Sequence, residues 1–264
     1  MPFSDLGNIS LYYEEYGEGD TVLFLPELGG STRSWRHVVA SLSQHFHLLL
    51  PDVRGTGLSE KPRGTYTMAE IAQDILKFTL NKGVEKFHLV GCAMGSIVSL
   101  EIALQAPDQV RSLVLCSVSP EIPERTKLYA GERARKVRAH GMREVSRSSS
   151  FNSFPEGTAI PFDVARNEYE ANFLANDPGA YAALSEALIA WEGGPKLSQI
   201  GCPCLCLAGD KDFMWDSDTV ETAAKALPNA VFDIVPRAGH FPPLSSPEDF
   251  AYKTTAFLRS VGST

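Results

Sequence analysis

Short apolar runs alternate with helical patterns along most of the chain, and this alternation restricts the folds that the chain can adopt. The apolar runs of strand length, each bounded by turn residues, are Ile9–Tyr13, Val22–Leu25, His47–Leu50, Phe87–Val90, Val110–Cys116, Cys204–Ala208 and Val231–Val235. Helical patterns lie between or after them, at 67–82, 96–105, 220–226 and 247–261. Strands separated by helices of this length imply a mostly parallel sheet covered by helices on both faces. We therefore expect an α/β fold.

The alternation is interrupted between residues 120 and 197, where no convincing strand pattern occurs. Helical stretches such as Arg133–Arg147 and Tyr169–Leu174 lie there instead. We expect residues 120–197 to form a helical cap, or lid, over the carboxyl ends of the strands. The core domain would then consist of residues 1–119 and 198–264.

The predicted cap is rich in basic residues. They include Arg125, Lys127, Arg133, Arg135, Lys136, Arg138, Arg143 and Arg147. Glu124, Glu132 and Glu144 are interleaved with them, which favours a solvated helix face over a patch that attracts an anionic substrate. The serine-rich stretch Ser146–Ser150 is expected to form a loop.

Composition and charge exclude several classes of function. The chain has 264 residues and a formal net charge of -8, so it lacks the basic footprint of a nucleic-acid-binding protein. No run of 18 apolar residues occurs, which argues against a spanning helix and a membrane partner. The N-terminal residues lack the basic start and apolar run of a secretory signal. We therefore expect a cytoplasmic protein.

The cysteines do not suggest a metal site. There are five of them, and Cys202, Cys204 and Cys206 alternate along one apolar run without a histidine or a second cysteine pair at ligand spacing. Alternate positions of a strand share a face, where free cysteine behaves as a small apolar residue. We expect neither a metal nor an organic cofactor.

The segment Leu89–Ser96 is the most informative for function. It reads L-V-G-C-A-M-G-S, a strand that turns into a helix through glycines on both sides of Ala93. This pattern is typical of a nucleophile elbow, which holds its central side chain above the sheet at a helix N-terminus. The central residue of such an elbow carries a nucleophilic atom, most often the hydroxyl of serine, and Ala93 has none.

Three further motifs occur, one before the elbow and two after it. They are D-V-R-G-T-G-L-S at 52–59, G-D-K-D at 209–212 and G-H-F at 239–241. Together with the elbow, they make the chain resemble the α/β-hydrolase superfamily along essentially its whole length. The closest likeness is to 3-oxoadipate enol-lactonases and related small lactone and ester hydrolases, with a looser likeness to fungal zearalenone lactonases. The resemblance implies a mostly parallel, eight-stranded sheet with a helical lid inserted after the sixth strand.

The resemblance also implies a role for each matching residue. His240 would be the general base, and Asp212, rather than Asp210, would accept a hydrogen bond from its other ring nitrogen. The backbone N–H groups of Leu28 and Met94 would form the oxyanion hole. The implied partner is a small-molecule ester or lactone, and the implied assembly is a monomer or a homodimer.

Two neighbouring residues near the predicted oxyanion hole depart from the family pattern. Pro26 stands where the family usually has histidine, and Glu27 brings a carboxylate close to the hole. Glu27 could contact a substrate, but we expect it to face solvent or to pair with a cation, because burying an unpaired charge is costly. We expect Trp191 and Phe241 to form apolar walls of the substrate pocket.

Ala93 leaves the function open between three interpretations. The chain could be a serine-to-alanine variant made to keep a bound substrate intact, a natural pseudo-enzyme that binds a ligand, or an enzyme that uses His240 without covalent catalysis. The main hypothesis is a lactone or carboxylic-ester hydrolase that acts through an acyl-enzyme and is inactive here because the nucleophile is missing. The alternatives are a hydrolase of carbon–carbon bonds with the same triad, and a non-catalytic ligand-binding pseudo-hydrolase.

Overall fold

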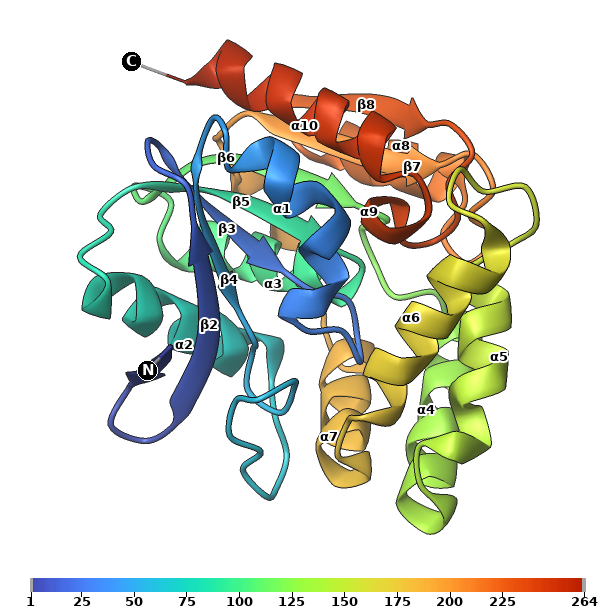
Figure 1. The fold of residues 1–264 in the computed structure, drawn as a ribbon. Coiled ribbons are helices and arrows are strands. Elements are labelled where there is room, and N and C mark those ends of the chain that lie inside the picture. Colours follow the sequence, from blue (N-terminus) through green and yellow to red (C-terminus); the bar gives the residue numbers. More distant parts are fainter. Residues whose placement is uncertain (1, 263–264) are drawn as a thin grey trace.

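An eight-stranded, mostly parallel sheet forms the centre of the molecule, as expected (Figure 1). The computed structural model describes residues 2–262. The strands are β1 (Phe3–Asp5), β2 (Ser10–Tyr16), β3 (Thr21–Leu25), β4 (His47–Pro51), β5 (Phe87–Cys92), β6 (Val110–Cys116), β7 (Cys204–Gly209) and β8 (Ala230–Val235). Their order in the sheet is β1-β2-β4-β3-β5-β6-β7-β8; β2 pairs antiparallel with both β1 and β4, and the other neighbouring strands are parallel. The short strand β1 was not expected from the sequence.

Helices cover both faces of this sheet, which is why its central strands are almost continuously apolar. The helices of the core are α1 (Arg36–Leu42), α2 (Met68–Asn81), α3 (Met94–Gln105), α8 (Ser217–Ala226), α9 (Pro242–Ser245) and α10 (Pro247–Val261). Helices α1 and α10 pack together on one face, and α2 packs on α3 on the other (Figure 1). Every residue of β5 is buried, so the strand that leads to Ala93 is fixed by the core on both sides.

The connection from β6 to β7 contains four α-helices, which form one group beside the sheet (Figure 1). They are α4 (Glu124–His140), α5 (Arg143–Ser153), α6 (Phe162–Leu174) and α7 (Pro178–Ile189), followed by the 3-10 helix η2 (Gly194–Gln199). We call the segment from α4 to η2 the insert. In the described part of the chain, no helix combines the length and the apolar character needed to cross a membrane.

Two expectations about the insert were wrong. The single helix expected at Arg133–Arg147 is divided between α4 and α5, because Gly141 adopts a left-handed conformation (φ 82°) that ends α4. The serine-rich stretch Ser146–Ser150 is helical rather than a loop. The hydroxyls of Ser146 and Ser150 donate to the backbone carbonyls three residues earlier, so the helix satisfies them internally.

Candidate active site

The turn between β5 and α3 places Ala93 in a strained backbone conformation. Its φ is 49° and its ψ is -110°, values that a residue with a Cβ atom rarely adopts and that cost roughly 1–3 kcal/mol. The two flanking glycines are required by close packing. A Cβ atom on Gly95 would lie 1.9 Å from the carbonyl oxygen of Leu25, and one on Gly91 would lie 2.5 Å from that of Gly95. The backbone therefore has the geometry of a nucleophile elbow although its central residue is alanine.

His240 and Asp212 form a buried hydrogen-bonded pair close to this turn. Nδ1 of His240 lies 2.8 Å from Oδ2 of Asp212, and both residues are almost fully buried. The other carboxylate oxygen accepts the backbone N–H groups of Met214 and Trp215, at 2.9 Å and 3.1 Å. Because the carboxylate only accepts, it assigns the ring proton to Nδ1 and leaves Nε2 available as a base. Asp210 instead accepts the backbone N–H of Ala238.

Ser117, which the sequence analysis missed, supports the same pair. It directly follows β6 and is one of the few non-glycine residues with positive φ (48°). Its hydroxyl lies 3.1 Å from Oδ2 of Asp212 and 2.8 Å from the backbone carbonyl oxygen of His240, to either of which it can donate. No motif points to Ser117, but its place at the end of the strand beside β5 could have suggested a position near the elbow.

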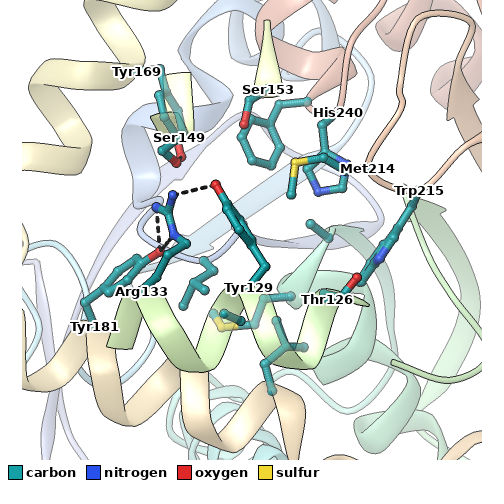
Figure 2. Close-up of a pocket in the computed structure, with 16 residues that line it drawn as sticks. Thr126, Tyr129, Arg133, Ser149, Ser153, Tyr169, Tyr181, Met214, Trp215 and His240 are labelled. Carbon is teal, nitrogen blue, oxygen red and sulfur yellow. Dashed lines mark hydrogen bonds between the residues drawn. The ribbon is translucent and has the colours of Figure 1, made fainter. Parts of the chain in front are cut away.

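A cavity brings most of the predicted site residues together (Figure 2). The core contributes Leu28, Ala93, Met94, Met214, Trp215, His240 and Phe241 to its lining. The insert contributes Thr126, Tyr129, Ala130, Arg133, Ser149, Ser153, Tyr169, Tyr181 and Leu188. Met94 is the first residue of α3, where backbone N–H groups have no partner within the helix. The residues predicted for base, nucleophile position and oxyanion hole thus share one cavity.

Trp191 does not line this cavity, contrary to expectation. Its indole N–H donates to Oε1 of Glu101 on α3, at 2.8 Å, and the ring borders a separate surface pocket with Pro120 and Lys127. A buried indole needs a partner for its N–H, and the carboxylate of Glu101 provides one on another side of the insert.

Glu27 is buried, so the expectation that it faces solvent or pairs with a cation was also wrong. Its side chain curls over Gly30, where a Cβ atom would lie 2.5 Å from the carboxyl carbon of Glu27. Ser34 donates its hydroxyl to Oε1 at 2.9 Å, whereas Oε2 is buried without a partner. Burial raises the pKa of Glu27 to about 7, against the lowering effects of the Ser34 hydrogen bond and the nearby His240. Protonation of the Glu27 carboxyl group reduces the free-energy cost of burying it. Glu27 is not among the residues that line the cavity.

Arg133 is the second functional candidate that the sequence analysis missed, because it was grouped with the solvated basic face. Only 6% of it is exposed, and its Nε and Nη2 atoms donate to the hydroxyl oxygen of Tyr181 at 3.2 Å and 3.0 Å. Nη1 donates to the hydroxyl oxygen of Tyr129 at 2.8 Å (Figure 2). The buried positions Ala130, Ala134 and Val137 on the same helix could have indicated an inward-facing side.

The guanidinium of Arg133 has no carboxylate within ion-pair distance among the residues that the structure describes. The hydroxyls of Tyr129 and Tyr181 accept from it, which leaves their own protons free to donate. Burial raises the pKa of the Tyr181 hydroxyl, so that proton stays in place at neutral pH. This end of the cavity is therefore cationic and rich in donors. In the described residues, no cluster of three or more metal-ligating side chains occurs.

Comparison with known proteins places this geometry in a family. A family model described as alpha/beta hydrolase fold matches residues 20–247. A relative from Azorhizobium caulinodans named "Putative carbamate hydrolase RutD" is 29% identical over 232 residues, which is 87% of this chain and 88% of that protein. The 3-oxoadipate enol-lactonase 2 of Acinetobacter baylyi is 20% identical over 254 residues, or 96% and 94% of the two chains.

A solved structure agrees over the whole molecule. A thermophilic esterase from Thermogutta terrifontis, studied with malate bound, is 25% identical and has a TM-score of 0.92, covering 100% of this chain and 98% of its own. The family match spans strands β3 to β8, the elbow and His240, and the resemblance to enol-lactonases is confirmed. This chain belongs to the α/β hydrolase family.

Proposed function

We propose that this fold hydrolyses a lactone or carboxylic ester through an acyl-enzyme when position 93 carries serine, and that the chain with Ala93 binds such a substrate without turning it over. The observation that carries the proposal is the His240–Asp212 pair in one cavity with the strained turn at Ala93. The relatives described above are named as a carbamate hydrolase, an enol-lactonase and an esterase. All three names describe cleavage at a carbonyl carbon that bears a heteroatom.

The proposed reaction follows from the positions of these groups. With serine at position 93, Nε2 of His240 takes the hydroxyl proton while the oxygen attacks the substrate carbonyl. The negative charge on the carbonyl oxygen is stabilised by the backbone N–H groups of Leu28 and Met94. The tetrahedral intermediate expels the alcohol, which receives the proton from His240. A water molecule then repeats the sequence on the acyl-enzyme and releases the carboxylic acid.

The first prediction is that Ala93→Ser turns an inert chain into a hydrolase. Loss of a triad nucleophile costs on the order of 10⁶ in rate, so the chain as it stands should show no measurable turnover. Serine needs no new backbone conformation, because the turn already has the φ and ψ of an elbow. The measurement is hydrolysis of a panel of aryl esters and lactones by both chains, with a burst of product from the Ala93→Ser form.

Two outcomes would point elsewhere. If both chains are inert while folded, non-covalent chemistry at His240 or a purely ligand-binding role becomes the better account. If only carbon–carbon bonds next to a carbonyl are cleaved, the alternative hydrolase class is correct. His240→Ala on top of Ala93→Ser is the control, and it should cost about as much as losing the serine.

We also propose that the substrate carries an anionic group, such as a carboxylate, which Arg133 binds. The guanidinium nitrogens of Arg133 already donate to protein oxygens, but no carboxylate balances their buried positive charge, and an anion in the cavity would do so. Tyr129 and Tyr181 can each donate a hydroxyl proton to the same anion. The esterase that resembles this chain was studied with malate, a dicarboxylate.

The second prediction is that Arg133→Gln weakens binding of carboxylate ligands and not of neutral ones. Hydrogen bonds to charged groups contribute about 1.5–3 kcal/mol, so the dissociation constant for a small dicarboxylate should rise roughly 10- to 100-fold. Titration calorimetry on the Ala93 chain measures this without turnover. The matched control is Arg138→Gln on the same helix, whose side chain is paired with Glu186 outside the cavity. Equal weakening by both variants would refute the assignment to Arg133.

We also propose a role for the insert, a cellular location and an oligomeric state. The insert would act as a lid, with residues 120–197 as the cap and the rest as the core domain. The protein would act in the reducing cytoplasm, with which the five free cysteines are compatible, as a monomer or a homodimer.

A further inference from the structure

The loop that carries Leu28 is held by the insert as well as by the core. We define the Leu28 loop as residues Pro26–Ser31. It contains a tight turn that is closed by the backbone N–H of Gly30, which donates to the carbonyl oxygen of Glu27 at 2.8 Å. Leu28 and Gly29 are the two central residues of this turn. Any group that fixes the turn therefore also fixes the direction of the Leu28 N–H.

Two asparagines of the insert contact this loop. The side-chain amide of Asn176, just past the end of α6, donates to the carbonyl oxygen of Gly29 at 2.8 Å, and it is buried. One turn earlier, Oδ1 of Asn172 accepts the hydroxyl of Ser31 at 2.8 Å. The insert thus holds the loop at Gly29 and at Ser31.

The packing around Gly29 shows how closely the loop lies against the insert. Gly29 has a φ of +81°, and a Cβ atom there would lie 3.0 Å from the ring of Phe173 and 3.2 Å from that of Tyr181. Without the Asn176 amide, the Gly29 carbonyl would lose a buried hydrogen bond. Earlier in α6, Glu168 accepts from His37 and Arg36 of α1, at 2.6 Å and 2.9 Å, so Glu168 and Asn172, one turn apart on α6, both contact the core.

We propose that Asn176 is a positioning residue, which sets the backbone N–H of Leu28 in the oxyanion hole from the insert side. The proposal rests on the proposed function, because it assumes that Leu28 donates to the oxyanion. It follows that the hole is complete only while the insert is docked on the core. Oxyanion donors act over a narrow range of distance, so a small displacement of the turn lowers the rate without removing any group that touches substrate.

The test makes the same chemical change at three positions of one segment. Asn172 contributes an acceptor, which aspartate retains, whereas Asn176 contributes a donor, which aspartate lacks. Asn172→Asp should therefore behave like the parent chain and Asn176→Asp should not. Asn167→Asp is the matched control, because Asn167 is exposed on the same helix. Asn176→Leu serves as an uncharged second variant, and thermal unfolding shows that each variant is folded.

The first readout needs no catalysis. Amide hydrogen exchange at Gly30 in the Ala93 chain reports the turn directly, since that N–H closes it. We expect Asn176→Asp and Asn176→Leu to accelerate this exchange at least about 10-fold and the other two variants to leave it unchanged. Exchange at Gly30 that is the same in all four variants would overturn the proposal.

The second readout is kinetic and uses the Ala93→Ser form. Asn176→Asp should lower kcat by about 10- to 100-fold and change KM by less than about 3-fold, because the donor acts mainly in the transition state. Faster exchange with an unchanged kcat, or parallel changes in kcat and KM, would contradict the positioning role. If the Ala93→Ser form is inert, the proposed function fails, and the exchange result alone decides whether Asn176 holds the turn.

Discussion

Glu27 illustrates how a single residue can depart from its family without losing the fold. The carboxyl group occupies space left by Gly30, and only one of its oxygens has a partner. Such a group is tolerated because it can keep its proton: burial raises its pKa to about 7. The Glu27 side chain is therefore protonated and neutral in acidic solution, and it becomes a buried anion as the pH rises above neutral.

This residue makes the stability of the fold depend on pH. The pKa of Glu27 rises from 4.5 to about 7 on folding, so the folded chain holds the proton more tightly than the unfolded chain. Its contribution to stability is complete below pH 4.5 and is lost as the pH rises through 7. Between pH 5 and pH 8 the parent should lose about 2–3 kcal/mol more unfolding free energy than Glu27→Gln. Urea unfolding at both pH values measures this, and parallel pH dependences of the two chains would contradict it.

At the scale of elements, the junction of β3, β5 and α3 depends on close approach of backbones. Helix α3 starts so near to β3 that a side chain at Gly95 has no room beside the carbonyl of Leu25. Gly131, in the middle of α4, has no such neighbour, since a Cβ atom there would be 3.8 Å from the nearest atom, a methyl of Ile189. A side chain therefore has no room at Gly95, whereas at Gly131 it has enough.

We expect opposite effects of alanine at these two positions. Gly95→Ala should destabilise the fold by about 3 kcal/mol or more, because backbone atoms on both sides must move. Gly131→Ala should stabilise it by about 0.5–1 kcal/mol, through better helix propensity and a less flexible unfolded chain. Denaturant unfolding of both variants measures the difference. A stable Gly95→Ala variant would mean that the elbow can relax in a way that its packing does not suggest.

At the scale of the whole molecule, the sequence predicts the sheet better than the insert. Strands such as β5 and β7 are buried at every position and consist mostly of apolar residues, so these runs can be recognised without the structure. The His240–Asp212 contact was predicted through the resemblance to α/β hydrolases, whose motifs occur in the same order in this chain. The insert contains no motif or strand pattern that predicts how its helices contact the core. The positions of Arg133 and Trp191 depend on which side of a helix meets the core, and polar partners such as Tyr181 and Glu101 come from distant segments.

The topology of the insert has a consequence for how enzymes of this kind diversify. The insert leaves the sheet at β6 and returns at β7, and these two strands pair directly. A segment that departs and returns at neighbouring strands can be lengthened, shortened or exchanged in evolution without altering the register of any strand. The sheet would keep the reacting groups while successive inserts present different ligand contacts to them. New preferences for substrate could therefore arise in one loop of an unchanged scaffold.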